Sequence, residues 1–261
     1  MTRQMSVAGT FYPARENELD RYFEHFNKIY DEQASLPNVK SKALIVPHAG
    51  YVYSGYTASI AYRLLQNSNL KTFVVIGPSH RVAFEGVSLC GAQSYETPFG
   101  SLQSADTLVE ELRENFHLGT ILNPHAEHST EVQFPFIQHY LGNVNIVELV
   151  YGNVKPEVLS KIIDFILKKE DCGVIISTDL SHFYTLEDAN TLDTICLSAI
   201  KNLDTNQLHH GCEACGMIGV EAMLLSAKKL GLHSNVLDYR TSADASDDTS
   251  RVVGYVSAYF H

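Results

Sequence analysis

Three apolar, β-branched runs of the chain are each followed within a few residues by side chains suited to metal or acid–base chemistry. These side chains are His48, His80, Asp179 and His182. Imidazole and carboxylate groups bind metal ions, and imidazole exchanges protons near neutral pH. A single histidine on a loop is usually only a solvated polar residue. Three separate placements at strand ends are harder to explain in that way.

The position of these residues predicts a shared cleft. In open α/β sheets, ligands bind beyond the carboxyl ends of the strands, where short loops on a rigid scaffold carry the reacting groups. If the three strands are neighbours in the sheet, their four side chains converge on one site.

A fourth segment, "NPHAEHSTEVQFPF", contains His125, Glu127, His128 and Glu131. His128 stands directly before Ser129, the expected N-cap of a helix, where the partial positive charge favours anions or a neutral imidazole. The H-x-x-H spacing is a weak metal signal by itself. We expect one of the two histidines to enter the site and the other to lie on the surface.

A fifth segment, "HHGCEACGMIGVEAMLL", contains the pair Cys212 and Cys215. Cys215 opens a predicted helix, and a thiol at a helix N-terminus has a lowered pKa, so it is a candidate metal ligand or reactive thiolate. A buried structural cysteine is the alternative. A structural zinc site is not predicted, because no second C-x-x-C or matching histidine pair is present. We expect no disulfide between these two cysteines.

Such a set of residues fits two kinds of metal chemistry. Two histidines and an anionic third ligand, with open positions, are typical of non-haem iron sites that activate dioxygen, and a further histidine can act as acid or base. Zinc hydrolases use the same residue types. The G-x-S-x-G elbow of serine hydrolases and the glycine-rich nucleotide loops are not found.

Composition limits the remaining classes. The chain has 261 residues, of which 45% are apolar, and these values predict one large domain over residues 1–261 with a substantial core. The net charge of −11 and scattered basic residues argue against nucleic acid as a partner. No signal-like or membrane-length apolar stretch is present, and five widely spaced cysteines are typical of reduced proteins. We therefore expect a soluble, cytoplasmic protein without a disulfide framework or a membrane partner.

The elements that must position the site alternate between strands and helices. Apolar periodicity predicts helices near residues 17–30, 55–66, 104–115, 129–141, 155–170, 186–201 and 216–230. Strands are predicted at 43–46, 72–76, 144–152 and 173–177, with a hairpin or meander over 86–103 and two terminal strands joined by an acidic loop. Ser104 is the expected N-cap of the third helix, and Pro135 implies a kink or a late start in the fourth. This order indicates an α/β fold with a mixed, mostly parallel central sheet flanked by helices.

The motifs "AGTFYPA", "VPHAGYVYSG", "IGPSH", "EHSTEVQFPF", "STDLSH" and "ACG" together resemble the Memo family. This family includes the B proteins of the AmmeMemoRadiSam gene clusters, and it is similar in fold to class III extradiol dioxygenases. The resemblance extends from about residue 7 to the C-terminus. It implies a dioxygenase-like fold, and the gene-cluster context suggests a radical-SAM protein as a partner.

The resemblance also implies residue roles. The metal ligands it implies are His48, His80 and Cys215. It also places three residues in the cleft beside the metal: His182, at the position of the acid–base group, Asp179 and His128. The dioxygenases have a glutamate where this chain has Cys215, and a thiolate favours softer metals such as copper(I) or a redox role.

Three functions arise as hypotheses. The first is a redox protein that uses iron or copper, with an unidentified substrate. The second is a module that binds a peptide or small molecule without turnover. The third is a zinc-dependent hydrolase.

Overall fold

The computed structural model describes residues 1–261 as eleven strands, ten α-helices and two short 3-10 helices. The α-helices are α1 (Glu16–Gln33), α2 (Tyr51–Leu65), α3 (Asp106–Phe116), α4 (His128–Glu131), α5 (Gln133–Leu141), α6 (Pro156–Leu167), α7 (Leu186–Asn202), α8 (Thr205–Leu208), α9 (Met217–Leu230) and α10 (Ala243–Ser246). The 3-10 helices are η1 (Gln66–Ser68) and η2 (Asn123–His125). The strands are β1 (Thr2–Arg3), β2 (Ala43–Val46), β3 (Thr72–Pro78), β4 (Val87–Leu89), β5 (Ser94–Thr97), β6 (Gly100–Ser104), β7 (Asn145–Tyr151), β8 (Cys172–Ser177), β9 (His182–Tyr184), β10 (Ser234–Thr241) and β11 (Val252–Phe260).

All strands belong to one mixed sheet, as predicted. Its order is β1-β5-β6-β7-β3-β8-β2-β11-β10, with β4 paired to β7 and β9 paired to β11. The central strands β7, β3, β8 and β2 are parallel, whereas β11 and β10 continue the sheet in antiparallel pairing. The two terminal strands expected from the sequence are therefore neighbours, and α10 lies in the loop between them.

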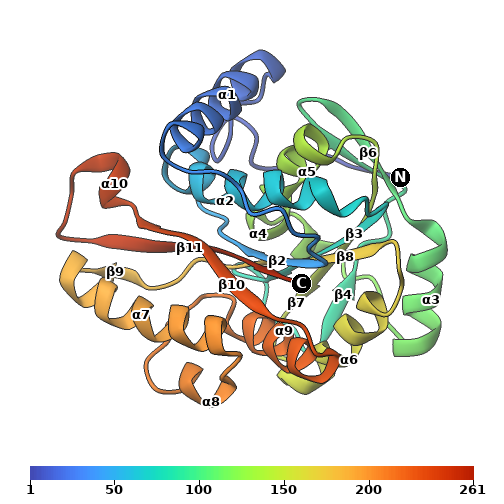
Figure 1. The fold of residues 1–261 in the computed structure, drawn as a ribbon. Helices are drawn as coiled ribbons and strands as arrows, with labels where there is room; N and C mark the ends of the chain where they lie inside the picture. Colours follow the sequence, from blue (N-terminus) through green and yellow to red (C-terminus); the bar gives the residue numbers. More distant parts are fainter.

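Helices cover both faces of the sheet (Figure 1). Alternate side chains of each strand enter opposite cores because successive residues of a strand point to opposite faces. In β2, Leu44 belongs to the core that includes residues of α1, α2 and α5, and Ile45 belongs to the core that includes residues of α3, α6, α7 and α9. Both faces of the central strands are thus buried, which explains their unbroken apolar runs.

Three local predictions can be compared directly with the structure. The prediction that Ser104 caps α3 is wrong: Ser104 ends β6, and Ala105 is the N-cap. The interruption expected from Pro135 is confirmed, because Val132 separates α4 from α5 and the proline lies in the first turn of α5, where its missing N–H leaves no bond unmade. In the 86–103 segment, β5 and β6 form the hairpin, whereas β4 pairs with β7.

The expectation of reduced cysteines is wrong for one pair. Cys196 in α7 forms a disulfide with Cys212, which precedes α9. The prediction that Cys212 and Cys215 are not linked is confirmed, since Cys215 is free. The helical periodicity of α7 buries Cys196 against this loop, a contact between segments sixteen residues apart that cysteine spacing does not reveal.

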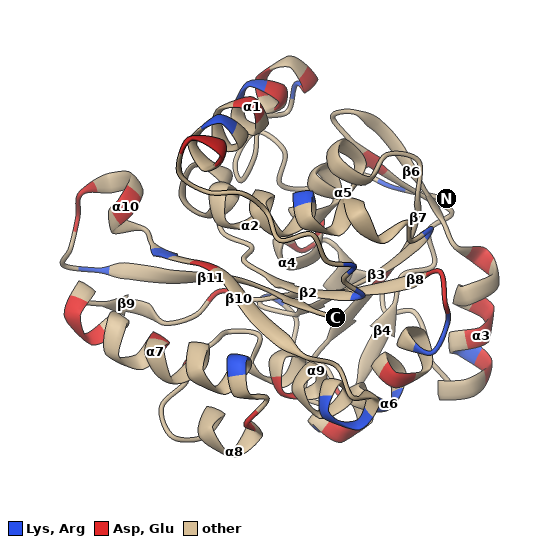
Figure 2. Ribbon diagram, viewed as in Figure 1, with Lys and Arg blue, Asp and Glu red and all other residues tan.

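Charged residues are distributed over many elements. Figure 2 shows Lys and Arg on separate helices and loops, whereas Asp and Glu recur on α1, α3 and around α10. None of the helices combines the length and the apolar character that crossing a membrane requires.

Candidate metal centre

The strands that precede the candidate residues are neighbours. β8 lies between β3 and β2, and all three run in the same direction. Their carboxyl ends therefore bring His80, Asp179 and His48 to one edge of the sheet, each two residues beyond its strand. Gly77 permits the close approach of α4 to β3, because a Cβ there would lie 2.8 Å from Oγ of Ser129. The convergence expected at this edge is observed.

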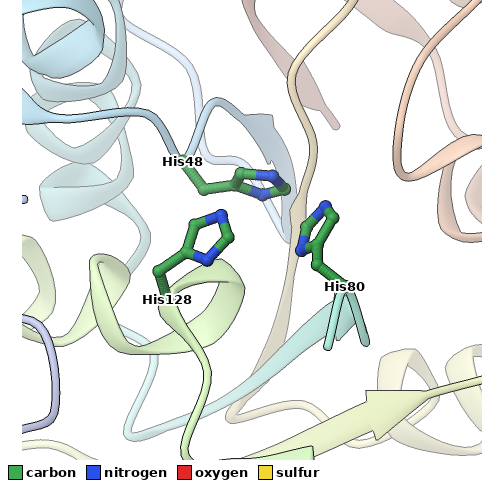
Figure 3. Close-up of side chains that lie close together, drawn as sticks. All are labelled: His48, His80 and His128. Carbon is green, nitrogen blue, oxygen red and sulfur yellow. The ribbon is translucent and has the colours of Figure 1, made fainter. Parts of the chain in front are cut away.

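Three imidazole rings meet at this edge (Figure 3). His48 follows β2, His80 follows β3, and His128 is the first residue of α4. Ring centroids are 5.1 Å apart for His48 and His80, 5.3 Å for His48 and His128, and 4.8 Å for His80 and His128. One nitrogen from each ring lies within 4.8 Å of the others, which is a spacing suited to a metal ion.

Hydrogen bonds determine which nitrogen of His48 faces the site. Ser177 donates its hydroxyl hydrogen to the carbonyl of Ser129, and its oxygen accepts from Nε2 of Gln133 at 2.8 Å. The same oxygen lies 3.0 Å from Nδ1 of His48. Because its only hydrogen is already donated, the oxygen must accept here, and Nδ1–H of His48 is the donor. Nε2 of His48 consequently carries the lone pair. Burial, with smaller contributions from the charges of His80 and His128, lowers the pKa of His48 well below its ordinary value, so the ring is neutral and able to bind a metal.

Glu127 lies against Nδ1 of the other two rings, as Ser177 lies against Nδ1 of His48. Its Oε1 lies 2.5 Å from Nδ1 of His128 and 3.4 Å from Nδ1 of His80. The carboxylate also accepts the backbone N–H groups of both histidines, each at 3.0 Å. Burial acts to raise the pKa of Glu127, but the bonds from His128 and His80 outweigh it and hold the pKa far below its ordinary value. An ionised carboxylate this close to both Nδ1 atoms favours the hydrogen on Nδ1 of each ring, which leaves Nε2 available to a metal.

We expect Glu127→Gln to weaken metal binding about 10–100-fold, the usual effect of losing an outer carboxylate. The amide has one acceptor oxygen for two ring N–H groups, so one ring loses its orientation. Titration calorimetry of the variant against wild type measures the change, with Glu110→Gln on the exposed surface of α3 as the matched control. Unchanged affinity in Glu127→Gln would show that packing alone holds the rings.

Cys215 places a sulfur beside His48. Its sulfur lies 3.2 Å from Nε2 of His48 and accepts the backbone N–H of Asp179 at 3.3 Å. Close packing requires Gly216 next to it, since a Cβ there would lie 2.6 Å from Thr178. The expected lowering of the thiol pKa is wrong for the protein without a metal. Burial and the charge of Asp179 raise the pKa of Cys215 to about 12, so a cation is required to stabilise the thiolate.

Asp179 is buried beside His48. Its Oδ1 accepts the backbone N–H of His48 at 2.7 Å, and its Oδ2 lies 3.9 Å from Nε2 of that ring. Burial raises the pKa of Asp179, although the bond from His48 lowers it. The carboxylate therefore faces the metal side of His48. The Nδ1 atoms of His48 and His128 lie against Ser177 and Glu127, not against Asp179.

His182 has a defined tautomer at the start of β9. Its Nδ1 lies 2.8 Å from the carbonyl oxygen of Leu180, which can only accept, so Nδ1 carries the hydrogen. Nε2 of His182 is therefore free to receive a proton. Its charge acts on the pKa of His48, but it makes no hydrogen bond with the three rings.

Other features of the site were not assigned from the sequence. Glu127, Ser177 and Phe11 had no predicted role, yet Glu127 and Ser177 bind the rings and Phe11 stacks on His128 at 4.6 Å. The available signal was the position of Ser177 at the end of β8, two residues before Asp179. The expectation that one of His125 and His128 lies on the surface is wrong, because His125 is buried against Ser88 and β7.

Comparison with known proteins places the chain in a family. The description "Memo-like protein" applies to a family whose sequence profile matches residues 3–259. The chain belongs to the Memo-like family. A "MEMO1 family protein" of Aquifex aeolicus is 33% identical, over 99% of this chain and 98% of its own length. One of Methanobrevibacter smithii is 35% identical over the full length of both chains, and one of Thermoplasma acidophilum is 34% identical over 98% of each. The Memo-like assignment therefore covers the whole domain, including every residue of the candidate centre.

Proposed function

We propose that this protein is a metal-dependent redox protein that binds iron or copper among His48, His80, His128 and Cys215. The observation that supports it is the convergence of three oriented imidazoles with a sulfur 3.2 Å from Nε2 of His48. Nitrogen and thiolate donors together suit iron and copper, and the soft sulfur favours copper(I).

The residues present fit such a metal. Ser177 and Glu127 leave Nε2 of each ring without a hydrogen, and His48 is neutral. When bound, iron or copper would supply one-electron chemistry or activation of dioxygen. Three imidazoles leave coordination positions for a substrate.

The chain itself supplies groups for proton transfer and substrate contact. His182 can accept a proton at Nε2, and the buried Asp179 places a carboxylate beside His48. A pocket of about 490 Å³ adjoins the centre, and Phe11, which stacks on His128, forms part of its lining together with Tyr53 and Arg15. We propose that this pocket receives a small molecule or peptide, and that a radical-SAM protein acts in the same pathway.

Metal analysis of protein purified without chelators or metal-affinity columns tests the proposal. Iron or copper near one equivalent per chain supports it. Zinc alone would favour a hydrolase, the second candidate, because three neutral histidines also form catalytic zinc sites. An empty site that rebinds no metal would favour a module that binds its ligand without turnover.

Cys215→Ser should separate the two metal classes. Removing the sulfur leaves three imidazoles, so we expect copper(I) affinity to fall at least tenfold, while zinc affinity changes little. Competition with a copper(I) chelator under anaerobic conditions measures the copper(I) affinity, and calorimetry measures the zinc affinity. Cys172→Ser, at the far end of β8, is the matched control. Equal loss of both metals would instead make Cys215 an obligatory ligand for either one.

A further inference from the structure

A second set of metal-binding side chains lies in the core, apart from the three rings described above. Cys90 follows β4, His125 ends η2, and Glu148 lies in β7. Their donor atoms lie within 4.8 Å of one another, and all three residues are at most 5% exposed. The proposed function does not use them.

His125 shows that this cluster lacks a partner. Its Nε2 pairs with Oγ of Ser88 at 2.9 Å, and that hydroxyl can donate its hydrogen to the carbonyl of Ile121. The ring therefore has a hydrogen-bond partner at Nε2. Its Nδ1 is buried without a hydrogen bond and lies 3.4 Å from Oε2 of Glu148. A buried ring nitrogen without a hydrogen bond is unfavourable, and a cation between Nδ1 and the carboxylate would satisfy both groups.

The local charge also favours a cation. Glu131 and Glu148 are buried with a single guanidinium, that of Arg3, which contacts both carboxylates. When His125 is neutral, two carboxylates against one guanidinium leave one buried negative charge. The thiolate form of Cys90 adds a second negative charge. A bound divalent ion would then balance the charges of Cys90, Glu131, Glu148 and Arg3. Burial and the charge of Glu148 raise the pKa of Cys90 to about 12, so the thiol remains protonated until such an ion binds.

Geometry and access are compatible with an ion. Tetrahedral zinc requires donor atoms roughly 3.5 Å apart, which small side-chain rotations can reach from the observed spacing. Thr130 donates to Oε1 of Glu148 at 2.6 Å and Arg3 to Oε2 at 3.2 Å, so the carboxylate is already oriented. A cavity of about 290 Å³ between the N-terminal residues and the segment that follows β4 has Cys90 and His125 in its wall.

We propose that Cys90, His125 and Glu148 form a second metal site, which binds a divalent cation of the zinc class. Thiolate, imidazole and carboxylate are the ligands of zinc, and a water can complete the tetrahedron. None of these three ligands is among the residues proposed to hold the redox metal.

Zinc binding to a protein without the first centre tests the proposal. In His48→Ala/His80→Ala/Cys215→Ser, we expect one zinc equivalent after equilibrium dialysis of the chelator-treated full chain. Adding Cys90→Ser should remove this equivalent, whereas adding Cys172→Ser should not. Failure of the triple variant to bind zinc, or retention of zinc after Cys90→Ser, would overturn the site, and a protonated His125 would then balance the charge of Glu148.

Cobalt(II) gives a test that keeps Cys90 intact and so does not depend on the folding of its variant. In Cys215→Ser/Cys172→Ser protein, Cys90 is the remaining free thiol. We expect cobalt to produce sulfur-to-cobalt charge-transfer absorption in the near ultraviolet, which zinc then displaces. Cobalt binding without that absorption would show that Cys90 is not a ligand.

Discussion

His48→Ala should abolish stoichiometric binding of iron or copper at the centre. His48 is the only ring in contact with both Cys215 and Asp179, so its loss removes one imidazole and separates the sulfur from the remaining two. The imidazoles of His80 and His128 would remain as two ligands, which are too few to hold the metal ion through dialysis. Metal content after dialysis, measured by mass spectrometry, should fall from about one equivalent of iron or copper to background.

The control for this variant is His210→Ala, since His210 is exposed and bonds only to the carbonyl of Asn206. It should retain the wild-type metal content. Thermal unfolding of metal-free protein distinguishes lost binding from lost folding. If folded His48→Ala bound iron or copper as tightly as wild type, the metal would have to lie elsewhere and the proposed centre would be wrong.

Glu131→Gln should destabilise the protein by about 3–5 kcal/mol, the usual cost of breaking a buried ion pair. The carboxylate of Glu131 is buried and pairs with Arg3. It also accepts the backbone N–H groups of Ser6 and Val7, each at 2.8 Å, and the hydroxyl of Tyr12 at 2.9 Å. The NH₂ group of an amide would face the N–H and O–H donors that now bind the carboxylate. The positive charge of Arg3 would also lose the negative charge of Glu131. Urea unfolding measures the change.

The effect should depend on pH with a definite sign. Burial acts to raise the pKa of Glu131, but the charge of Arg3 and the bonds from Ser6 and Val7 lower it below the ordinary value of 4.5. A carboxylate with a lowered pKa contributes its full stability above its unfolded pKa and loses it as the pH falls. The difference between wild type and Glu131→Gln should therefore shrink as the pH falls below about 4.5.

Glu110→Gln is the control, because Glu110 pairs with Arg113 on the surface. Its effect on stability should stay within about 0.5 kcal/mol. A similarly small effect of Glu131→Gln, or a difference that does not change with pH, would show that Glu131 is not ionised in the fold.

The fold class, the order of the main strands and the three strand ends that carry His48, His80 and Asp179 could all be predicted from the sequence. They depend on local rules: apolar runs bounded by turn residues form buried strands, and parallel strands place the residues after their carboxyl ends at one edge of the sheet. The break before α5 was likewise predictable, because the geometry of Pro135 is fixed within its own residue.

The groups that control these residues became evident only from the packing of the folded chain. Glu127 binds the rings of His80 and His128, which belong to separate segments, and Ser177 on β8 orients His48 after β2. The pairing of Cys196 with Cys212, the burial of His125 and the raised pKa of Cys215 depend on packing in the same way. The physical reason is that burial and charge act through space: they depend on every element packed around a residue, whereas periodicity reports only its own segment.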